Sequence, residues 1–187
     1  MLEFFSGTAI TSKIARSMGW NTVTIDFDPQ HEATYCEDIL TMDYTQLPAP
    51  DHLHASMDCT TYSKAAHGHH RVSEDNAEKF GLLQGAPRSE TAHQADKLLA
   101  RLLNEIIPYF LEINPRMTVC IENPEGYLKF HSAMQLLTRV KSSYGCYNWP
   151  ERKNTDFFVN FPLKLMHTNA GGCWKMVVDK SFYEGIV

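Results

Sequence analysis

The stretch that decides the fold runs from Leu53 to Ser63 and reads LHASMDCTTYS. A short apolar run breaks at Ser56-Met57-Asp58 and delivers one cysteine, Cys59, onto a polar turn. In an α/β protein the ligand crevice opens at the carboxyl ends of the buried strands, which is where a nucleophile would lie. A single cysteine is equally compatible with a small, half-buried hydrophobe, so the assignment depends on the rest of the chain.

The composition is that of an ordinary globular protein. Hydrophobic residues make up 43% and charged residues 21% of the 187 residues, which favours a single domain spanning residues 1–187. No run approaches the roughly 18–20 apolar residues of a membrane span, and a signal-peptide pattern is missing, so we expect a cytoplasmic protein without a membrane partner. The five cysteines are scattered without CxxC spacing, which argues against a disulfide framework and a zinc ribbon.

Upstream of Leu53 the pattern predicts the start of a βαβ unit. Leu2–Phe5 is an apolar strand, and Ser6-Gly7-Thr8 turns it into a helix at Ala9–Gly19. The apolar face of this helix comprises Ile10, Ile14 and Met18. A helix that opens after such a turn can face a ligand, although most such turns bind nothing. Thr22–Asp28 predicts a second strand, in which Asp26 either hydrogen-bonds ribose hydroxyls or simply closes the strand.

Two segments of different character flank the Cys59 strand. Before it, Pro29–Thr34 predicts the start of a helix, and Cys36–Asp43 predicts a short edge strand in which Asp38 can accept from an adenine amino group. After it, Lys64–Thr91 has no periodicity and predicts an irregular active-site loop whose basic side chains are candidates for phosphate contacts. The loop sequence HGHH (67–70) lacks helical spacing and a partner cluster, so no metal site is predicted.

The next two elements complete the expected site. Ala92–Ile113 has the strongest helical pattern of the chain, and Pro108 should kink or shorten it. Met117–Ile121 predicts a buried parallel strand that runs directly into Glu122-Asn123-Pro124. A carboxylate at the end of one strand and a cysteine at the end of another indicate one shared site.

The remainder of the chain predicts a helix followed by short strands. The helix spans His131–Val140, and an antiparallel strand pair follows at Ser143–Trp149 and Asp156–Phe161, with a short strand at Trp174–Val178. Residues 139–187 carry seven Lys and Arg against four acids, although the whole chain has a formal charge of −5. This part is therefore either a surface for a phosphate backbone or a solvated mixed surface.

With the FFSGT turn (4–8), Asp26, Cys59 and the ENP turn (122–124) in this order, the chain resembles the cytosine-C5 DNA methyltransferases, and most closely their short phage versions. The resemblance runs from about Leu2 to Asn160. It implies an α/β, Rossmann-like fold with a mostly parallel sheet and an antiparallel final strand pair. It also implies S-adenosylmethionine as methyl donor, and a covalent mechanism on cytosine in DNA.

The resemblance also implies roles for particular residues. The cofactor-binding set is Phe5, Ser6, Gly7, Thr8, Asp26, Phe27, Asp38 and Ile39. The catalytic set is Cys59 as nucleophile, Glu122 as hydrogen-bonding partner of the cytosine ring, and Arg152, which would either hold the ring oxygen or help to lower the pKa of the thiol. Because a base inside a duplex cannot meet these groups, the cytosine must be flipped out or single-stranded.

The chain departs from the family pattern at two points. Asp58 stands where a proline normally precedes the cysteine, and a carboxylate there disfavours a thiolate. Only 27 residues follow Asn160, so no separate target-recognition domain is expected, and selectivity would come from a partner, a second subunit or the 64–91 loop. Two alternatives therefore stay open. The chain is either a weak or silent relative that acts as a cofactor- or DNA-binding decoy, or an enzyme for RNA or free cytidine nucleotide.

Overall fold

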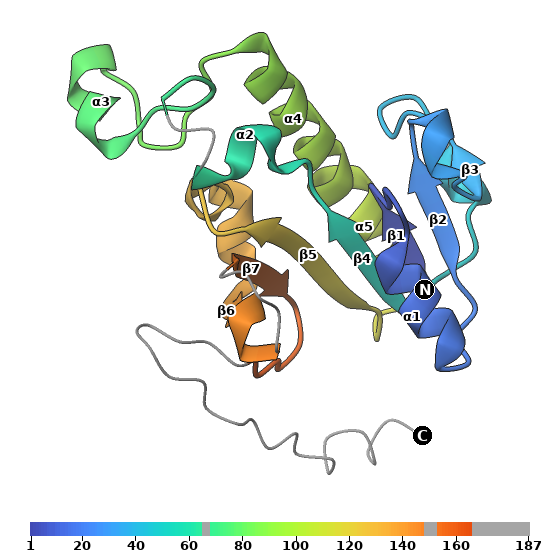
Figure 1. The fold of residues 1–187 in the computed structure, drawn as a ribbon. Coiled ribbons are helices and arrows are strands. Elements are labelled where there is room, and N and C mark those ends of the chain that lie inside the picture. The colour runs from blue at the N-terminus through green and yellow to red at the C-terminus, as the bar shows by residue number, and fades with distance from the viewer. Residues whose placement is uncertain (65–67, 148–152, 166–187) are drawn as a thin grey trace.

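The computed structural model describes residues 1–64, 68–147 and 153–165, and these residues form an α/β fold around one seven-stranded sheet (Figure 1). The strands lie in the order β3-β2-β1-β4-β5-β7-β6. Strands β1 to β5 pair in parallel, and β7 pairs antiparallel with both β5 and β6. The expected α/β fold with a mostly parallel sheet and an antiparallel final strand pair is therefore confirmed, and it is consistent with a Rossmann-like fold. The strands are β1 (Leu2–Phe4), β2 (Val23–Asp26), β3 (Tyr35–Cys36), β4 (His52–Ser56), β5 (Thr118–Pro124), β6 (Thr138–Ser143) and β7 (Asn154–Val159).

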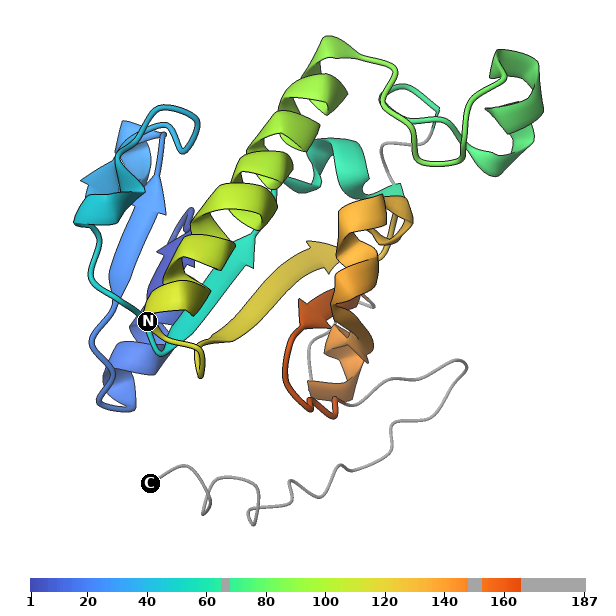
Figure 2. The ribbon, with the colours of Figure 1, turned by 180° about the vertical axis from the view of Figure 1, so that it is seen from behind.

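One face of the sheet carries the hydrophobic core. Alternate residues of the central strands point to this face, among them Phe4, Ile25, Leu53 and Ile121, all almost completely buried. A long helical segment crosses behind them, as Figure 2 shows from that side. It consists of α4 (Glu90–Arg101), a π-helical turn (Leu102–Ile106) and α5 (Ile107–Ile113). The expected helix therefore exists, and the π turn lies directly before Pro108, which has no N–H to donate.

The opposite face of the sheet is polar, and helix α1 (Ile10–Ser17) lies on it. Glu3 of β1 is buried there and accepts a hydrogen bond from the Ser12 backbone N–H at 2.8 Å. This polar contact turns the apolar side of α1 outward. Ile10, Ile14 and Met18 are 63%, 57% and 73% exposed, so the expected apolar face of this helix does not pack on the sheet.

Two predictions for the C-terminal third were wrong. The expected helix at His131–Val140 is a 3-10 helix (Ser132–Leu136) followed by strand β6, and the expected strand at Ser143–Trp149 begins with another 3-10 helix (Tyr144–Tyr147). Thr138 and Val140 are β-branched, and the six residues of β6 all pair with β7, which outweighs the helical spacing of the local apolar residues. The expected strand at Trp174–Val178 lies outside the described residues.

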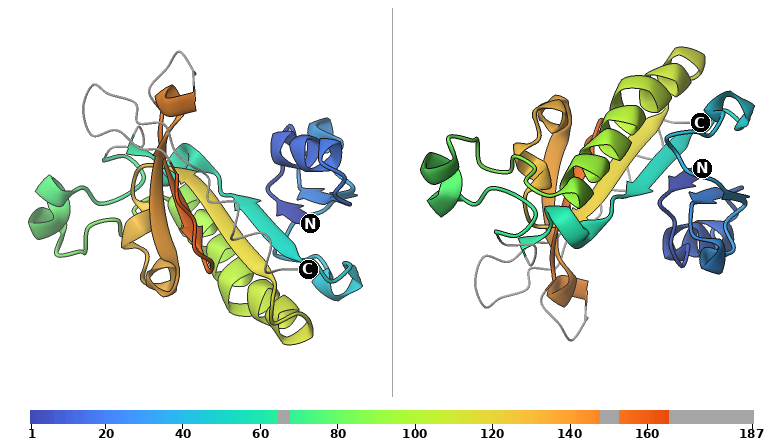
Figure 3. Two further views of the ribbon diagram at one scale, coloured as in Figure 1. Left: turned by 90° about the horizontal axis from the view of Figure 1, so that it is seen from below. Right: turned by 90° about the horizontal axis from the view of Figure 1, so that it is seen from above.

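The remaining helices are short. Helix α2 spans Cys59–Tyr62, and α3 spans Glu74–Phe80 inside the segment expected to be irregular. Further 3-10 turns are Pro29–His31, Tyr44–Gln46 and Leu128–Phe130. Figure 3 shows that α3 stands away from the sheet on an extended loop. Across the described ranges, no helix has the length and apolar character needed to cross a membrane.

Candidate active site

Cys59 lies at the carboxyl end of β4, as expected, and is the first residue of α2. Its side chain is exposed. The preceding residue, Asp58, is the N-cap of this helix. Its carboxylate accepts hydrogen bonds from the Thr60 backbone N–H at 2.9 Å and from the Thr60 hydroxyl at 2.7 Å. Asp58 therefore has a structural use in starting the helix that presents the cysteine.

Glu122 lies beside this turn because β4 and β5 are parallel neighbours. Ser56 pairs with Glu122 in the sheet, and the Met57 backbone N–H donates to the Glu122 carbonyl at 3.3 Å. The next residue, Asn123, is completely buried, and its side-chain amide donates to the Met57 carbonyl at 2.9 Å. These contacts fix the turn that carries Cys59 to the strand that carries Glu122, as the strand order predicts.

The carboxyl group of Glu122 has an unusual environment. Burial raises its pKa above the ordinary value, and the charge of nearby Lys153 only partly opposes this shift. Its Oε1 atom is buried and has no hydrogen-bond partner among the described residues. A carboxyl group with a raised pKa and a buried oxygen that lacks a partner is suited to hydrogen-bond a polar group of a ligand.

The turn after β1 is strained in the manner of a functional site. Phe5 and Ala9 have positive φ values of 55° and 54°, and Gly7 has 50°. Ser6 is buried between them, and its hydroxyl oxygen has no hydrogen-bond partner within the described part of the chain. The turn is therefore held in an unfavourable backbone conformation around an unsatisfied polar atom, which is a typical arrangement where a ligand supplies the missing partner.

Asp26 holds this turn in place. Burial disfavours its charged form, but hydrogen bonds from the backbone of Asp28 and Gly7 and from His31 outweigh this effect and lower its pKa. The Gly7 N–H donates to one carboxylate oxygen at 2.8 Å, and the Asp28 N–H to the other at 3.0 Å. The His31 Nδ1 lies 3.1 Å from the second oxygen. Asp26 thus keeps its charge at the end of β2 and orients the turn of β1.

The other expected cofactor residues lie at the same edge of the sheet but in different environments. Phe27 is 73% exposed, Thr8 is exposed, and Asp38 is exposed with one carboxylate oxygen bonded to the Leu40 N–H at 2.9 Å. Ile39 is buried in the hydrophobic core. Because β1, β2 and β3 are parallel neighbours, their carboxyl ends lie at one edge of the sheet, which is where open α/β sheets bind ligands.

Arg152 lies outside the described residues, so its expected place beside Cys59 is untested. The sequence interpretation missed Asn123 as the residue that ties the Cys59 turn to β5, and Asp58 as a cap. A signal existed for both. An amide directly after the expected strand-end acid is suited to a neighbouring carbonyl, and Asp followed by a Thr-rich turn is typical of a helix start.

No family model matches the chain, and no curated protein matches it. Among the described residues, no three side chains of the metal-binding types come together as a possible metal site.

Proposed function

We propose that the protein transfers a methyl group from S-adenosylmethionine to C5 of cytosine in DNA, with Cys59 as the covalent nucleophile. One observation carries the proposal. The exposed Cys59 thiol and the Glu122 carboxyl group, whose Oε1 atom is buried without a partner among the described residues, lie at the ends of adjacent parallel strands. The hydrogen bond of Asn123 to Met57 joins these strand ends. A thiol and a protonated carboxyl group are the two side chains that addition to a cytosine ring requires.

The residues at the ends of β1, β2 and β3 fit the proposed cofactor. The buried Ser6 hydroxyl without a partner and the strained turn of residues 5–9 would receive the methionine part, and exposed Phe27 and Asp38 would receive the adenine. Asp26, whose low pKa keeps it charged, would receive the ribose hydroxyls alongside its backbone contacts. S-adenosylmethionine supplies an electrophilic methyl group.

The chemistry of the chain's own residues follows from cytosine. C5 is too weak a nucleophile by itself, but a bond from the Cys59 sulfur to C6 converts the ring to an enamine that is nucleophilic at C5. Glu122 would donate its proton toward N3 and accept from the exocyclic amine, which neutralises the charge that builds on the ring. Loss of the C5 proton to a base then breaks the bond between sulfur and C6, and the thiolate of Cys59 is regenerated.

The test compares wild type with the Cys59→Ser variant in two assays, methyl transfer and covalent trapping. Purified protein is incubated with radiolabelled cofactor and, side by side, with DNA, RNA and dCMP, and the DNA arm is repeated with 5-fluorocytosine to trap the covalent adduct. We expect wild type to label and trap DNA, and Cys59→Ser to lose both signals. Cys36→Ser is the matched control, because it makes the same change at the other exposed cysteine of the described residues.

Equal labelling by Cys59→Ser and wild type would show that Cys59 is not the nucleophile. Label in RNA or dCMP but not in DNA would instead identify a different substrate for the same site. Cofactor binding without any labelling or trapping would favour the silent, decoy-type relative.

A further inference from the structure

We propose that Arg71 is the positioning residue for Cys59, and that it links the arm formed by residues 70–88 to the helix on which the nucleophile lies. The inference deepens the proposed function and rests on it only for the identity of the reaction. Helix α2 is too short to be stable alone, and contacts from other parts of the chain stabilise it.

Helix α2 cannot hold its own shape. It has four residues, and an isolated helical turn is unstable because one hydrogen bond does not offset the conformational entropy of fixing three residues. Its internal bond joins the Ser63 N–H to the Cys59 carbonyl at 3.0 Å. Its last carbonyl groups therefore need outside donors. Tyr127 supplies one by donating its backbone N–H to the Tyr62 carbonyl, and Arg71 supplies another.

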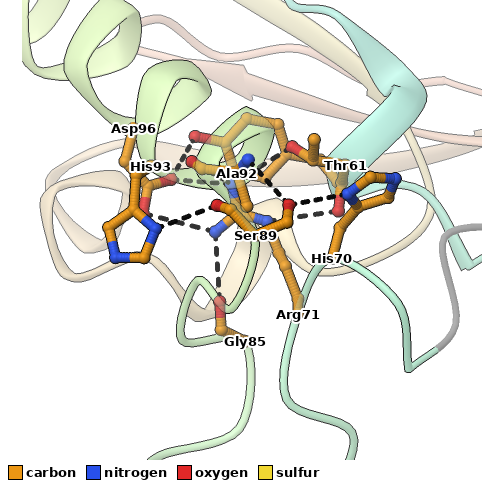
Figure 4. A network of polar contacts seen from close by, with 9 residues as sticks. Thr61, His70, Arg71, Gly85, Ser89, Ala92, His93 and Asp96 are labelled. Atoms are coloured by element: carbon orange, nitrogen blue, oxygen red, sulfur yellow. Dashed lines mark hydrogen bonds and ion pairs between the residues drawn. The ribbon is translucent and has the colours of Figure 1, made fainter.

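Arg71 is the largest of the fully buried side chains, with 1% exposure. Its Nε donates to the Thr61 carbonyl at 3.2 Å, and its Nη2 to the Thr61 hydroxyl at 3.2 Å (Figure 4). The guanidinium group also lies over the Tyr62 ring, 3.9 Å from its centre. One side chain thus holds two of the four residues of the helix that Cys59 begins.

The same guanidinium group reaches helix α4. Its Nη2 lies 2.7 Å from the Asp96 carboxylate, which balances the buried charge, and 3.4 Å from the Ala92 carbonyl. The Tyr62 hydroxyl donates to the same carboxylate at 2.7 Å. Because α4 packs into the core, Asp96 fixes Arg71 to the rigid part of the molecule. A lysine would place a single ammonium here and could not reach all these acceptors at once.

The third connection is to the arm. The Arg71 Nη1 donates to the Gly85 carbonyl at 3.1 Å. Backbone bonds close the base of the arm between Val72 and Ala86, between Gly85 and Val72, and between Arg88 and His70. Helix α3 forms the outer end of this arm and stands away from the sheet (Figures 1 and 3). A displacement of the arm base therefore pulls on the side chain that supports Thr61, and so reorients Cys59.

The experiment compares Arg71→Lys with Arg116→Lys, which makes the same change at an exposed arginine just before β5, at the opposite end of the strand from Glu122. Three quantities are measured on the full chain: kcat and KM for methyl transfer to DNA, the rate of trapping on 5-fluorocytosine DNA, and hydrogen exchange of the amides of residues 60–63. We expect Arg71→Lys to lower kcat and the trapping rate by about 10- to 100-fold with KM within about twofold, because a misplaced nucleophile slows the chemical step. Exchange at residues 60–63 should rise by about tenfold, and Arg116→Lys should leave all three quantities near wild type.

A second variant guards against a general loss of folding. Thr61→Val keeps the shape of the side chain but removes the hydroxyl that Arg71 contacts, and it should move the same quantities in the same direction by a smaller factor. Unchanged kcat, trapping and exchange in a folded Arg71→Lys protein would overturn the proposal. If wild type itself neither methylates nor traps DNA, the proposed function fails, but the exchange of residues 60–63 still decides the role of Arg71.

Discussion

Glu122 combines a position at the end of β5 with a pKa that is shifted in the direction the proposed chemistry requires. Its pKa is raised by burial, so the carboxyl group keeps its proton further toward neutral pH than an exposed glutamate does. The proton is lost as pH rises through this raised pKa, and donation to the cytosine ring is lost with it. Methyl transfer should therefore decline on the alkaline side through the titration of this group.

Glu122→Gln should lower the single-turnover rate of methyl transfer by about 100-fold, because an amide can occupy the site but cannot transfer a proton to the ring. The alkaline decline assigned to Glu122 should also disappear from the pH–rate profile. Glu125→Gln is the matched control. The pKa of Glu125 is about 2, chiefly through its hydrogen bond from Lys64, so it stays ionised throughout the assay range. An alkaline decline that persists in Glu122→Gln would assign it to another group.

At the scale of elements, the site depends on how β5 is joined to the turn after β4. Asn123→Ala should destabilise the fold by about 1–3 kcal/mol, because it leaves the buried Met57 carbonyl without its donor. It should also slow covalent trapping, since the turn that carries Cys59 loses its fixed position. Thermal unfolding and trapping kinetics measure the two effects.

Asn114→Ala provides the comparison for that variant. The Asn114 amide makes the same kind of bond, to the Pro50 carbonyl at 3.0 Å, but at the opposite end of the same pair of strands. Asn114→Ala should therefore lower the free energy of unfolding without slowing covalent trapping. If both variants slowed trapping equally, the effect would be one of general stability rather than of the Cys59 turn.

The sequence predicts elements well where local pattern and tertiary environment agree. The apolar runs of β1, β4 and β5 satisfy both. Because parallel strands end at one edge, the placement of Cys59 and Glu122 at the ends of neighbouring strands could be predicted. Strand β6 could not be predicted from the sequence, because its pairing with β7 overrides the helix-like spacing of Met134, Leu137 and Val140. Helix α3 had a readable signal that was missed. Ser73 precedes two acids in its first turn, and Gly81 ends it in a left-handed conformation.

Contacts such as those of Arg71 could not be predicted from the sequence. They join residues 10 to 25 positions apart through side-chain geometry, and no periodicity marks a buried arginine. Charge patterning alone indicated a phosphate contact for this residue, whereas the folded chain buries it. The sequence therefore predicts the reacting side chains of the candidate site better than it predicts their supports.

For the whole molecule, the two faces of the sheet predict different tolerance to substitution. Ile14→Gln on the exposed side of α1 should change the free energy of unfolding by less than about 0.5 kcal/mol. Leu99 is fully buried in α4, on the other side of the sheet. Leu99→Ala should lower the free energy of unfolding by about 2–5 kcal/mol because it leaves a cavity. Denaturant unfolding measures both. A large loss of stability in Ile14→Gln would mean that another segment or a partner covers α1.

The supports of the Cys59 turn also give the protein an order of assembly. The chain is synthesised from its N-terminus, and 66 positions separate Met57 from Asn123, whose amide fixes the turn. Until β5 and the residues after it have emerged, the Cys59 turn lacks the donors that Asn123 and Tyr127 supply, although Arg71 has already been synthesised. Under the proposed function, a nascent chain therefore carries the thiol long before this thiol is held in place, and methyl transfer should begin only when the strand bearing Glu122 has joined the sheet.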